Sequence, residues 1–115
     1  MDPRNTKLAE QLITYSVKLK PGEKIYIEIK GIEAMELGKE LIRAATVHGG
    51  VPFWYYNDET LSRGFIKNAD QEQFQAWGRF HRPIMESVDA YIGVRGSTNP
   101  FDLADVSADH LKWHD

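Results

Sequence analysis

The stretch between Gly22 and Asp58 changes its hydrophobic period twice, and this limits the chain to a small set of folds. Residues Lys24–Lys30 alternate apolar and polar side chains, which is the period of a β-strand. From Glu33 to Val47 the apolar residues recur with the period of a helix. Val51–Tyr56 is rich in aromatic residues and too short for a helix, which indicates a second strand. Two strands joined by a crossover helix run parallel, so this stretch predicts a β-α-β unit.

The crossover helix has a predicted buried face and a predicted end. Its apolar face carries Ala34, Leu37, Leu41 and Ala45, with Ile42 and Ala44 beside them. Gly49 and Gly50 follow the helix, at the position where a residue in the left-handed conformation commonly ends a helix. We therefore expect this helix to pack on the sheet along that face and to stop at the glycine pair.

A further helix is predicted before the first strand. Asp2-Pro3 can begin it, because aspartate caps a helix N-terminus and proline suits the first helical position. Its apolar stripe comprises Leu8, Leu12, Tyr15 and Leu19, flanked by Ile13 and Val17. Pro21-Gly22 ends the helix and turns the chain into the strand.

A short helix is predicted after the second strand, from Glu59 to about Lys67. Asn57 or Asp58 can cap its N-terminus with a side-chain oxygen. Its apolar residues, which we expect to be buried, are Leu61, Phe65 and Ile66.

A longer helix is predicted to begin at Asp70, because Asp70 and Gln73 have the spacing of a capping box. Its apolar positions are Phe74, Trp77, Phe80 or His81, Ile84, Met85 and Val88. Pro83 lies inside this pattern and removes a helical hydrogen bond, so we expect a kink or a break near Arg82.

The last part of the chain predicts a third strand and a final helix. Ala90–Val94 is a nearly continuous apolar run, which is typical of a strand covered on both faces. Gly96–Pro100 is predicted to be a loop, and Ser107 to cap a helix carrying Leu111 and Trp113. This helix has barely begun at Asp115, which suggests a piece of a longer chain.

The predicted element order is α-β-α-β-α-α-β-α, which indicates an α/β fold. We expect a three-layer Rossmann-like sandwich with a small, mainly parallel sheet. By its length, the stretch 1–115 is a single α/β domain.

Composition excludes several classes of protein. The net charge is −3 and there is no run of lysine or arginine, which argues against nucleic acid as a partner. The chain has no cysteine, which excludes disulfides, thiol catalysis and cysteine-bound zinc. It has no apolar signal segment at its start and no apolar run of membrane-spanning length, so we expect no membrane and a cytoplasmic protein.

His110 and His114 are the first candidates for chemistry, because side chains four residues apart on a helix can face one metal ion. The zinc-protease signature requires a glutamate directly after the first histidine, and Leu111 occupies that position. Two histidines without a third ligand rarely hold zinc, so a polar helix face is the favoured interpretation.

The other candidates have ordinary structural interpretations. His48 suits the C-terminus of a helix and His81 suits aromatic packing. The turn at Gly31 lacks the glycine pattern of a phosphate-binding loop, and the Ser97–Asn99 segment has the residues of an ordinary turn, although it could hydrogen-bond a small polar ligand. Arg79 and Arg82, with Trp77 and Phe80, are favoured as an amphipathic helix over a single-strand nucleic-acid site. We therefore assign no catalytic, cofactor-binding or metal-binding residue.

Several segments, taken in order, resemble a known family. These are Asp2-Pro3-Arg4, Lys7-Leu8-Ala9, Tyr15-Ser16-Val17, Lys20-Pro21-Gly22-Glu23-Lys24, His48-Gly49-Gly50-Val51-Pro52, Asn99-Pro100 and Leu103-Ala104-Asp105-Val106. Together they are similar to the N-terminus of the thermophilic metallo-aminopeptidases, the family of aminopeptidase T, aminopeptidase S and PepS. The resemblance runs from Asp2 to about Leu111.

The resemblance implies the N-terminal part of a longer, two-domain, dimeric enzyme. Such enzymes use divalent metal ions, zinc, cobalt or similar, to remove N-terminal amino acids from peptides. Their metal ligands lie in a C-terminal domain, so no ligand or catalytic residue carries over to this chain, and His110 and His114 match none. The implied function is thus a metal-dependent aminopeptidase whose metal site lies outside these 115 residues. The alternative is a stand-alone Rossmann-like binding or interaction domain without catalysis.

Overall fold

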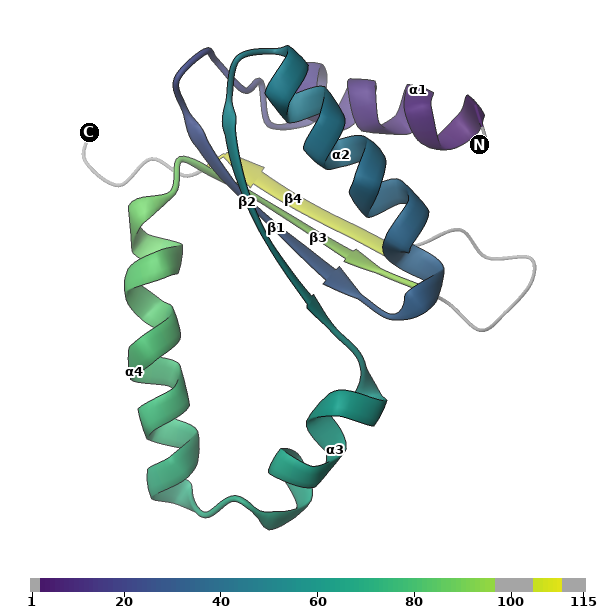
Figure 1. Cartoon of the computed structure of the whole chain (residues 1–115). Helices are drawn as coiled ribbons and strands as arrows, with labels where there is room; N and C mark the ends of the chain where they lie inside the picture. The colour runs from purple at the N-terminus through teal and green to yellow at the C-terminus, as the bar shows by residue number, and fades with distance from the viewer. Residues whose placement is uncertain (1–2, 97–104, 111–115) are drawn as a thin grey trace.

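The computed structural model describes residues 3–96 and 105–110 of the chain. Its strands form one sheet in the order β2-β1-β3-β4 (Figure 1). β1 (Lys24–Lys30) lies between β2 (Val51–Asn57) and β3 (Ala90–Arg95) and is parallel to both. β4 (Asp105–His110) pairs with β3 in the antiparallel direction. The predicted α/β fold with a small, mainly parallel sheet is therefore confirmed.

The helices precede and follow the strands in the predicted order. α1 (Pro3–Gln11) continues into a short π-turn, η1 (Leu12–Ser16), before β1. A 3₁₀ turn, η2 (Ile32–Ala34), and then α2 (Met35–Val47) join β1 to β2. α3 (Glu59–Asn68) and α4 (Gln71–Ser87) join β2 to β3. None of the helices among the described residues is long and apolar enough to cross a membrane.

The segment after residue 104 corrects the sequence prediction. We expected Ser107 to cap a helix, but Asp105–His110 forms β4, with Ser107 opposite Gly93. A short helix gains few hydrogen bonds for the cost of its first turn, whereas pairing satisfies the open backbone edge of β3. Leu111 and Trp113, which the predicted helix was to carry, lie outside the described residues.

One face of the sheet carries the hydrophobic core. Ile27 of β1 lies beside Ile92 of β3. Because side chains alternate between the two faces of a strand, the residues two positions before and after each of them lie on the same face. The buried residues of this core cluster from the sheet and from α2 are Ile25, Ile27, Ile29, Ala90, Ile92, Val94, Leu37, Leu41, Ala44 and Ala45. The predicted face of the crossover helix is confirmed, because Leu37, Leu41 and Ala45 are all buried.

The crossover helix ends as its glycines predicted. Gly49 has φ +86°, a conformation that side chains with a Cβ rarely adopt. The Gly49 N–H donates to Thr46 O at 3.0 Å and the Gly50 N–H donates to Ala45 O at 2.9 Å. These bonds satisfy carbonyls that the end of α2 would otherwise leave open. The chain then enters β2 directly.

The N-terminal segment buries the predicted Leu12 and Leu19 and both flanking residues, but not Tyr15. Leu12 and Ile13 are buried, but Tyr15 is 73% exposed. The cause is the π-turn, in which the Val17 N–H donates to Leu12 O at 3.0 Å instead of to the residue four positions back. The wider turn changes the direction in which the following side chains point. Val17 therefore faces the core, and Tyr15 faces away from it.

β2 lies at the edge of the sheet among the described residues, and its proline agrees with this position. The Val51 N–H donates to Glu23 O at 2.8 Å, and the Gly31 N–H donates to Asn57 O at 2.9 Å. Since parallel strands direct alternate residues to the same neighbour, Pro52 directs its backbone away from β1. A residue without an N–H therefore sits where no sheet hydrogen bond is required of it.

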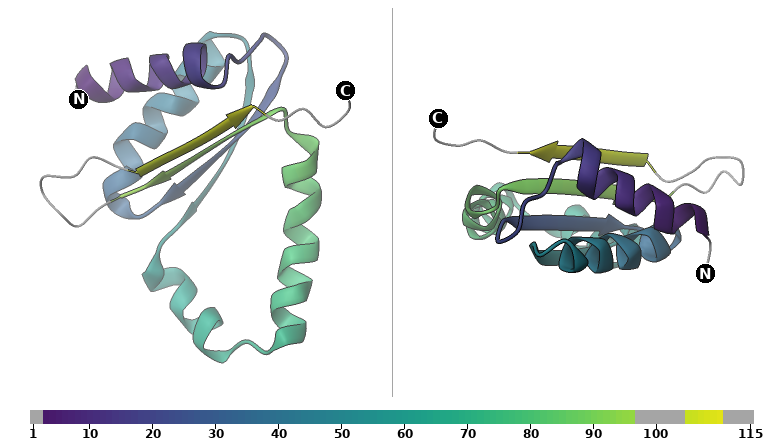
Figure 2. Two further views of the ribbon diagram at one scale, coloured as in Figure 1. Left: turned by 180° about the vertical axis from the view of Figure 1, so that it is seen from behind. Right: turned by 90° about the horizontal axis from the view of Figure 1, so that it is seen from above.

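α3 and α4 form a helical arm (residues 59–87) that stands apart from the other helices (Figures 1 and 2). Neither helix has a buried residue, so the burial predicted for Leu61, Phe65 and Ile66 is wrong. The radius of gyration is 15.1 Å, and a compact domain of this length would have about 13 Å. Amphipathic spacing identifies the apolar face of a helix but does not establish that a partner covers it.

Local capping explains how the arm remains helical. The Asp58 side chain accepts from the Leu61 N–H at 2.9 Å and caps α3, as one of the two predicted candidates. The predicted capping box is present in α4, where Asp70 and Gln73 each accept from the other's backbone N–H at 2.9 Å. α4 continues past Pro83 to Ser87, so the break expected near Arg82 does not occur.

We predict that Leu41→Asp unfolds the domain. Loss of the buried leucine costs about 2–5 kcal/mol, and the new carboxylate must be buried or neutralised. The sum approaches the whole stability of a small domain, about 5–15 kcal/mol. Urea unfolding followed by tryptophan fluorescence measures the change.

Val47→Asp is the matched control, because Val47 lies on the same helix and is 68% exposed. Its expected cost is about 1 kcal/mol or less, since it adds only a surface charge near a helix C-terminus. Equal loss of stability in the two variants would contradict the assignment of the buried face.

Candidate functional site

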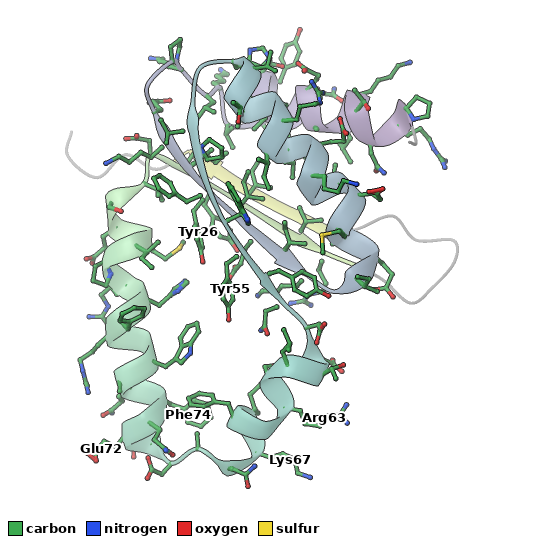
Figure 3. All side chains as sticks on the ribbon, viewed as in Figure 1. Tyr26, Tyr55, Arg63, Lys67, Glu72 and Phe74 are labelled. Carbon is green, nitrogen blue, oxygen red and sulfur yellow. The ribbon has the colours of Figure 1, made fainter. Side chains whose placement is uncertain are left out.

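The sheet face opposite α1 and α2 is mostly polar and aromatic, and we call it the open face. Strand alternation places Tyr26, Glu28 and Lys30 of β1 on it, next to Tyr55 of β2 and Tyr91 of β3. Figure 3 shows Tyr26 and Tyr55 pointing from the sheet to the side where α4 lies. Two cavities among the described residues open on or at the end of this face.

The first cavity, which we call the aromatic groove, lies between the open face and α4 and has a volume of about 600 Å³. The His81 ring stacks on Trp77 at 5.1 Å between centroids and meets Tyr26 edge-on at 5.6 Å. Tyr55 meets Trp77 edge-on at 6.3 Å. These ring contacts hold the middle of α4 near the sheet and leave a mainly apolar groove beside it.

Tyr26 is the most strongly perturbed titratable group of the groove. Its side chain is buried, with 4% of its surface exposed. Burial, the negative charge of Glu28 and the neighbouring Tyr55 together raise the pKa of Tyr26 to about 12. The phenol is therefore a neutral hydrogen-bonding group in the physiological range and is unsuited to act there as a base.

Glu28 lies next to the groove and is held by its neighbours. The Tyr91 hydroxyl donates to Glu28 Oε1 at 2.6 Å, across from β3 to β1. Lys30 Nζ lies 3.9 Å from the same oxygen. The carboxylate is thus oriented by one short hydrogen bond and one long ion pair within the sheet face.

The second cavity, which we call the carboxyl-end pocket, lies where the parallel strands end and has a volume of about 610 Å³. Its lining residues are Lys30, Gly31, Ile32, Glu33, Asn57, Asp58, Glu59, Thr60, Ser62, Arg95 and Gly96. β2, the next strand in the chain after β1, lies on one side of β1, and β3 lies on its other side. The direction in which strands are added to the sheet therefore reverses between β1 and β3. Open α/β sheets bind ligands outside the carboxyl ends of the strands, at such a reversal.

Two glycines bring the loops of this pocket together. Gly31 has φ +95°, which favours glycine, and it begins the turn into η2. A Cβ on Gly96 would lie 2.6 Å from Glu33 Cβ and 3.0 Å from the Ala34 nitrogen. Only a residue without a side chain fits there, so the end of β3 packs directly against the start of the crossover.

The hydrogen bonds of Asp58 keep one side of the pocket negative. The Leu61 backbone N–H, and then the Tyr56 hydroxyl, lower the pKa of Asp58 by hydrogen-bonding its carboxylate. The same bond to Asp58, at 2.9 Å, raises the pKa of Tyr56. Asp58 is thus an ionised cap whose acceptor oxygens are already engaged by its own helix and strand.

The structure assigns ordinary roles to the histidines that it describes. His48 Nε2 lies 2.9 Å from Glu10 Oε2 and joins the end of α2 to α1. His81 packs among the groove aromatics, as predicted. His114 and the side chain of His110 lie outside the described part of the chain, as does the Ser97–Asn99 segment.

The predicted cationic-aromatic cluster of α4 is divided by the fold. Trp77 and Phe80 both line the aromatic groove, but Phe80 is 81% exposed. Arg79 and Arg82 are exposed and line neither cavity. The arrangement matches the amphipathic helix that the sequence favoured.

Sequence reasoning missed Lys30, Asn57 and Arg95 as members of one pocket. Each is the last residue of its strand, and register places Lys30 beside both of the others. The sequence contained one signal, since Lys30 ends a predicted strand and Asn57 and Arg95 each directly follow one. Their proximity required the strand order, which residue periodicity does not specify.

Comparison with known proteins decides the family. A family model described as "Thermophilic metalloprotease (M29)" matches residues 1–114. The chain belongs to the M29 family. A solved structure described as "Wild-type AmpT from Thermus thermophilus" is 30% identical, with a TM-score of 0.49. The match covers 61% of this M29 chain and 18% of that chain. A search of curated proteins finds no match.

Membership of a metalloprotease family implies a metal ion, and the described residues do not fit one. Within residues 3–96 and 105–110, no group of three or more histidine, aspartate, glutamate or cysteine side chains converges on one point. The carboxyl-end pocket has Glu33, Asp58 and Glu59 in its lining, but Lys30 and Arg95 line it as well. Cationic side chains at that position oppose a divalent cation.

We predict that Tyr26 makes folding sensitive to high pH. The folded-state pKa of about 12 lies above the ordinary value of 10.0, so the neutral phenol stabilises the folded state fully below pH 10. This contribution decreases as the pH rises from 10 to 12. In Tyr26→Phe the urea midpoint should fall less over that interval than in the parent chain. Ultraviolet absorbance should also show one late-titrating tyrosine fewer, and an unchanged titration would contradict the assignment.

Proposed function

We propose that this chain is the N-terminal α/β domain of a metal-dependent aminopeptidase of the cytoplasm. The complete enzyme would remove N-terminal amino acids from peptides, using divalent metal ions such as zinc or cobalt. The metal ligands would belong to a further domain, and the domain described above would shape access to them. Its contribution would be positioning and binding, without a catalytic residue of its own.

The observation that carries this proposal is the M29 match over residues 1–114, combined with the lack of a donor group among the described residues. A metalloprotease must hold its metal with several donors at one point. A family domain whose described residues offer no such point supports a metal site located elsewhere in the protein.

The exposed apolar side chains support a second part of the proposal, which is that the enzyme is a homodimer. Phe80, Trp54 and Leu61 are each more than half exposed, at 81%, 58% and 66%. Trp54 and Phe80 line the same groove, and exposed apolar side chains that gather in this way are common at interfaces. Sedimentation of the complete gene product should give twice the mass of one chain, and a monomer at micromolar concentration would contradict this part alone.

The alternative is a stand-alone binding domain without catalysis. Two of the cavities lined by described residues, the aromatic groove and the carboxyl-end pocket, favour it, because each is large enough for a small ligand. The two functions differ in what the complete gene product does to a peptide, so peptidase activity separates them.

We predict that the 115-residue chain lacks peptidase activity and that the complete gene product has it. Chromogenic leucine anilide substrates, with zinc or cobalt added, measure both. Turnover by the short chain that disappears in His110→Ala/His114→Ala would contradict the proposed location of the metal site. An inactive complete gene product, with every divalent metal supplied, would favour the binding domain.

We also predict that the short chain binds no divalent metal tightly, because its described residues offer no converging donors. Calorimetric titration with zinc and with cobalt measures this affinity. A stoichiometric site with a dissociation constant below about 1 µM, roughly 8 kcal/mol, would contradict the prediction.

A further inference from the structure

We propose that the aromatic groove binds a small aromatic carboxylate, whose ring would lie among the groove's aromatic side chains and whose carboxylate would meet the Tyr26 hydroxyl and Lys24. The proposal goes beyond the function proposed above and does not depend on it. It rests on a buried hydroxyl without a partner, on the charge of the lining and on the arrangement of the rings.

The Tyr26 hydroxyl points to a ligand because it lacks a partner. Its side chain is 4% exposed, lines the groove and points from the sheet to the side where α4 lies (Figure 3). The hydroxyl has no hydrogen bond with any other residue that the structure describes. Every fully buried side-chain nitrogen or oxygen atom in that part of the chain has a partner, so this hydroxyl must reach the open space of the groove. A hydrogen-bonding group set among apolar walls is the kind that orients a ligand.

Tyr26 has a proton to donate throughout the physiological range. Burial, and then the charge of Glu28, raise its pKa to about 12, so the phenol stays neutral. Glu28 itself does not line the groove, and its Oε1 already accepts from the Tyr91 hydroxyl at 2.6 Å. The Tyr26 proton thus remains for an acceptor that a ligand brings.

The charge of the lining sets the charge of that acceptor. None of the described residues that line the groove is acidic, and Lys24 is the one lysine or arginine among them. The nearby Asp89 carboxylate accepts from the Lys24 backbone N–H at 2.9 Å, and no ion pair joins it to the Lys24 ammonium. Lys24 and Tyr26 are two residues apart on β1 and therefore lie on one face of the strand. A single carboxylate can accept from both of them.

The walls of the groove suit a flat ring. Trp77 and His81 stack with 24° between their planes, and Tyr55 stands edge-on to both. The volume of about 600 Å³ lies within the range of small-molecule sites. An aromatic ligand would add edge-on or offset-stacked contacts of the kind that the groove already contains.

The same features disfavour other small ligands. An amine, an amino acid or a peptide carries an ammonium group, and the described lining has no carboxylate to receive it. An inorganic anion would meet Lys24 but leave the apolar walls in contact with water. An uncharged aromatic compound would fill the groove without using the charge of Lys24. The ligand that satisfies all three features joins an aromatic ring to one carboxylate.

Calorimetric titration of the 115-residue chain with 2-naphthoate tests the proposal. We expect one site with a dissociation constant of about 1 mM or below, an ordinary affinity for so small a ligand. 2-Naphthamide keeps the ring without the charge, and 2-naphthylmethylammonium reverses the charge. Each should bind about tenfold more weakly than 2-naphthoate or worse. Acetate, which has the charge without the ring, should show no binding up to about 10 mM.

Backbone amide chemical shifts locate the ligand on the chain. On addition of 2-naphthoate they should change along β1 near Tyr26 and along α4 near Trp77 and His81. Changes confined to the carboxyl-end pocket, or to α1 and α2, would place the ligand elsewhere and overturn the proposal.

Variants identify the side chains that hold the carboxylate. Tyr26→Phe removes only the hydroxyl and Lys24→Met removes only the charge, so each should weaken 2-naphthoate binding about tenfold. Both should also reduce the preference for 2-naphthoate over 2-naphthamide, which a change in packing alone would not do. Lys67→Met is the matched control, because Lys67 is another exposed lysine and does not line the groove. Urea midpoints of all variants confirm that each remains folded.

The proposal is overturned if 2-naphthoate shows no binding up to about 10 mM. It is equally overturned if Tyr26→Phe and Lys24→Met bind 2-naphthoate as Lys67→Met does, since the ring would then adsorb without help from either group. Tighter binding of 2-naphthamide or of 2-naphthylmethylammonium would also refute it. The peptidase activity and the dimer proposed above are tested on the complete gene product, so they and this site can fail separately.

Discussion

The packing of β1 against the crossover helix is the interaction on which the rest of the structure depends. Ile25, Ile27 and Ile29 are almost fully buried, and they meet Leu37 and Leu41 of α2 in one cluster. β1 is also the strand that pairs with both β2 and β3. Without this contact the central strand would no longer be anchored in the core. The pairing register of β2 and β3, which both depend on β1, would then be lost as well. The burial of these branched side chains supplies the main driving force for the fold.

The central position of β1 also creates the carboxyl-end pocket. Because β2 lies on one side of β1 and β3 on the other, the turns after β1 and β3 begin next to each other. Gly96 allows those turns to touch, since a Cβ there would clash with Glu33. The charged residues that end the strands are brought together as a consequence. The carboxyl-end pocket thus follows from the same strand pairing that builds the core.

The helical arm has a different physical basis from the sheet. Its helices begin at strong caps, and Phe65 meets Phe74 edge-on at 5.2 Å between the two helices. Figure 3 shows Phe74 directed toward α3, while Arg63 and Lys67 point away from the space between the helices. The arm is therefore amphipathic, but its own chain buries none of it among the described residues. An enzyme assembled from further domains or a second copy could use such a surface, in agreement with the function proposed above.

The sequence by itself determined the elements, because periods, caps and breakers act within a few residues. It predicted the β-α-β unit, the buried face of α2, the cap at Asp70, a cap at Asn57 or Asp58, and the end of α2 at the Gly49-Gly50 pair. Local order also carried the family resemblance, and the M29 match confirmed it.

Tertiary structure alone decided which elements meet. Tyr15 was displaced by a π-turn that a regular period does not anticipate, and Asp105–His110 became a strand because β3 offered an open edge. Leu61 and Ile66 were predicted from their spacing to be buried, yet no described part of the chain covers them. Lys30 and Arg95 are 65 positions apart in number and adjacent in register. Periodicity reports how side chains are arranged along one element, whereas burial and the assembly of a site depend on the neighbours that the fold supplies.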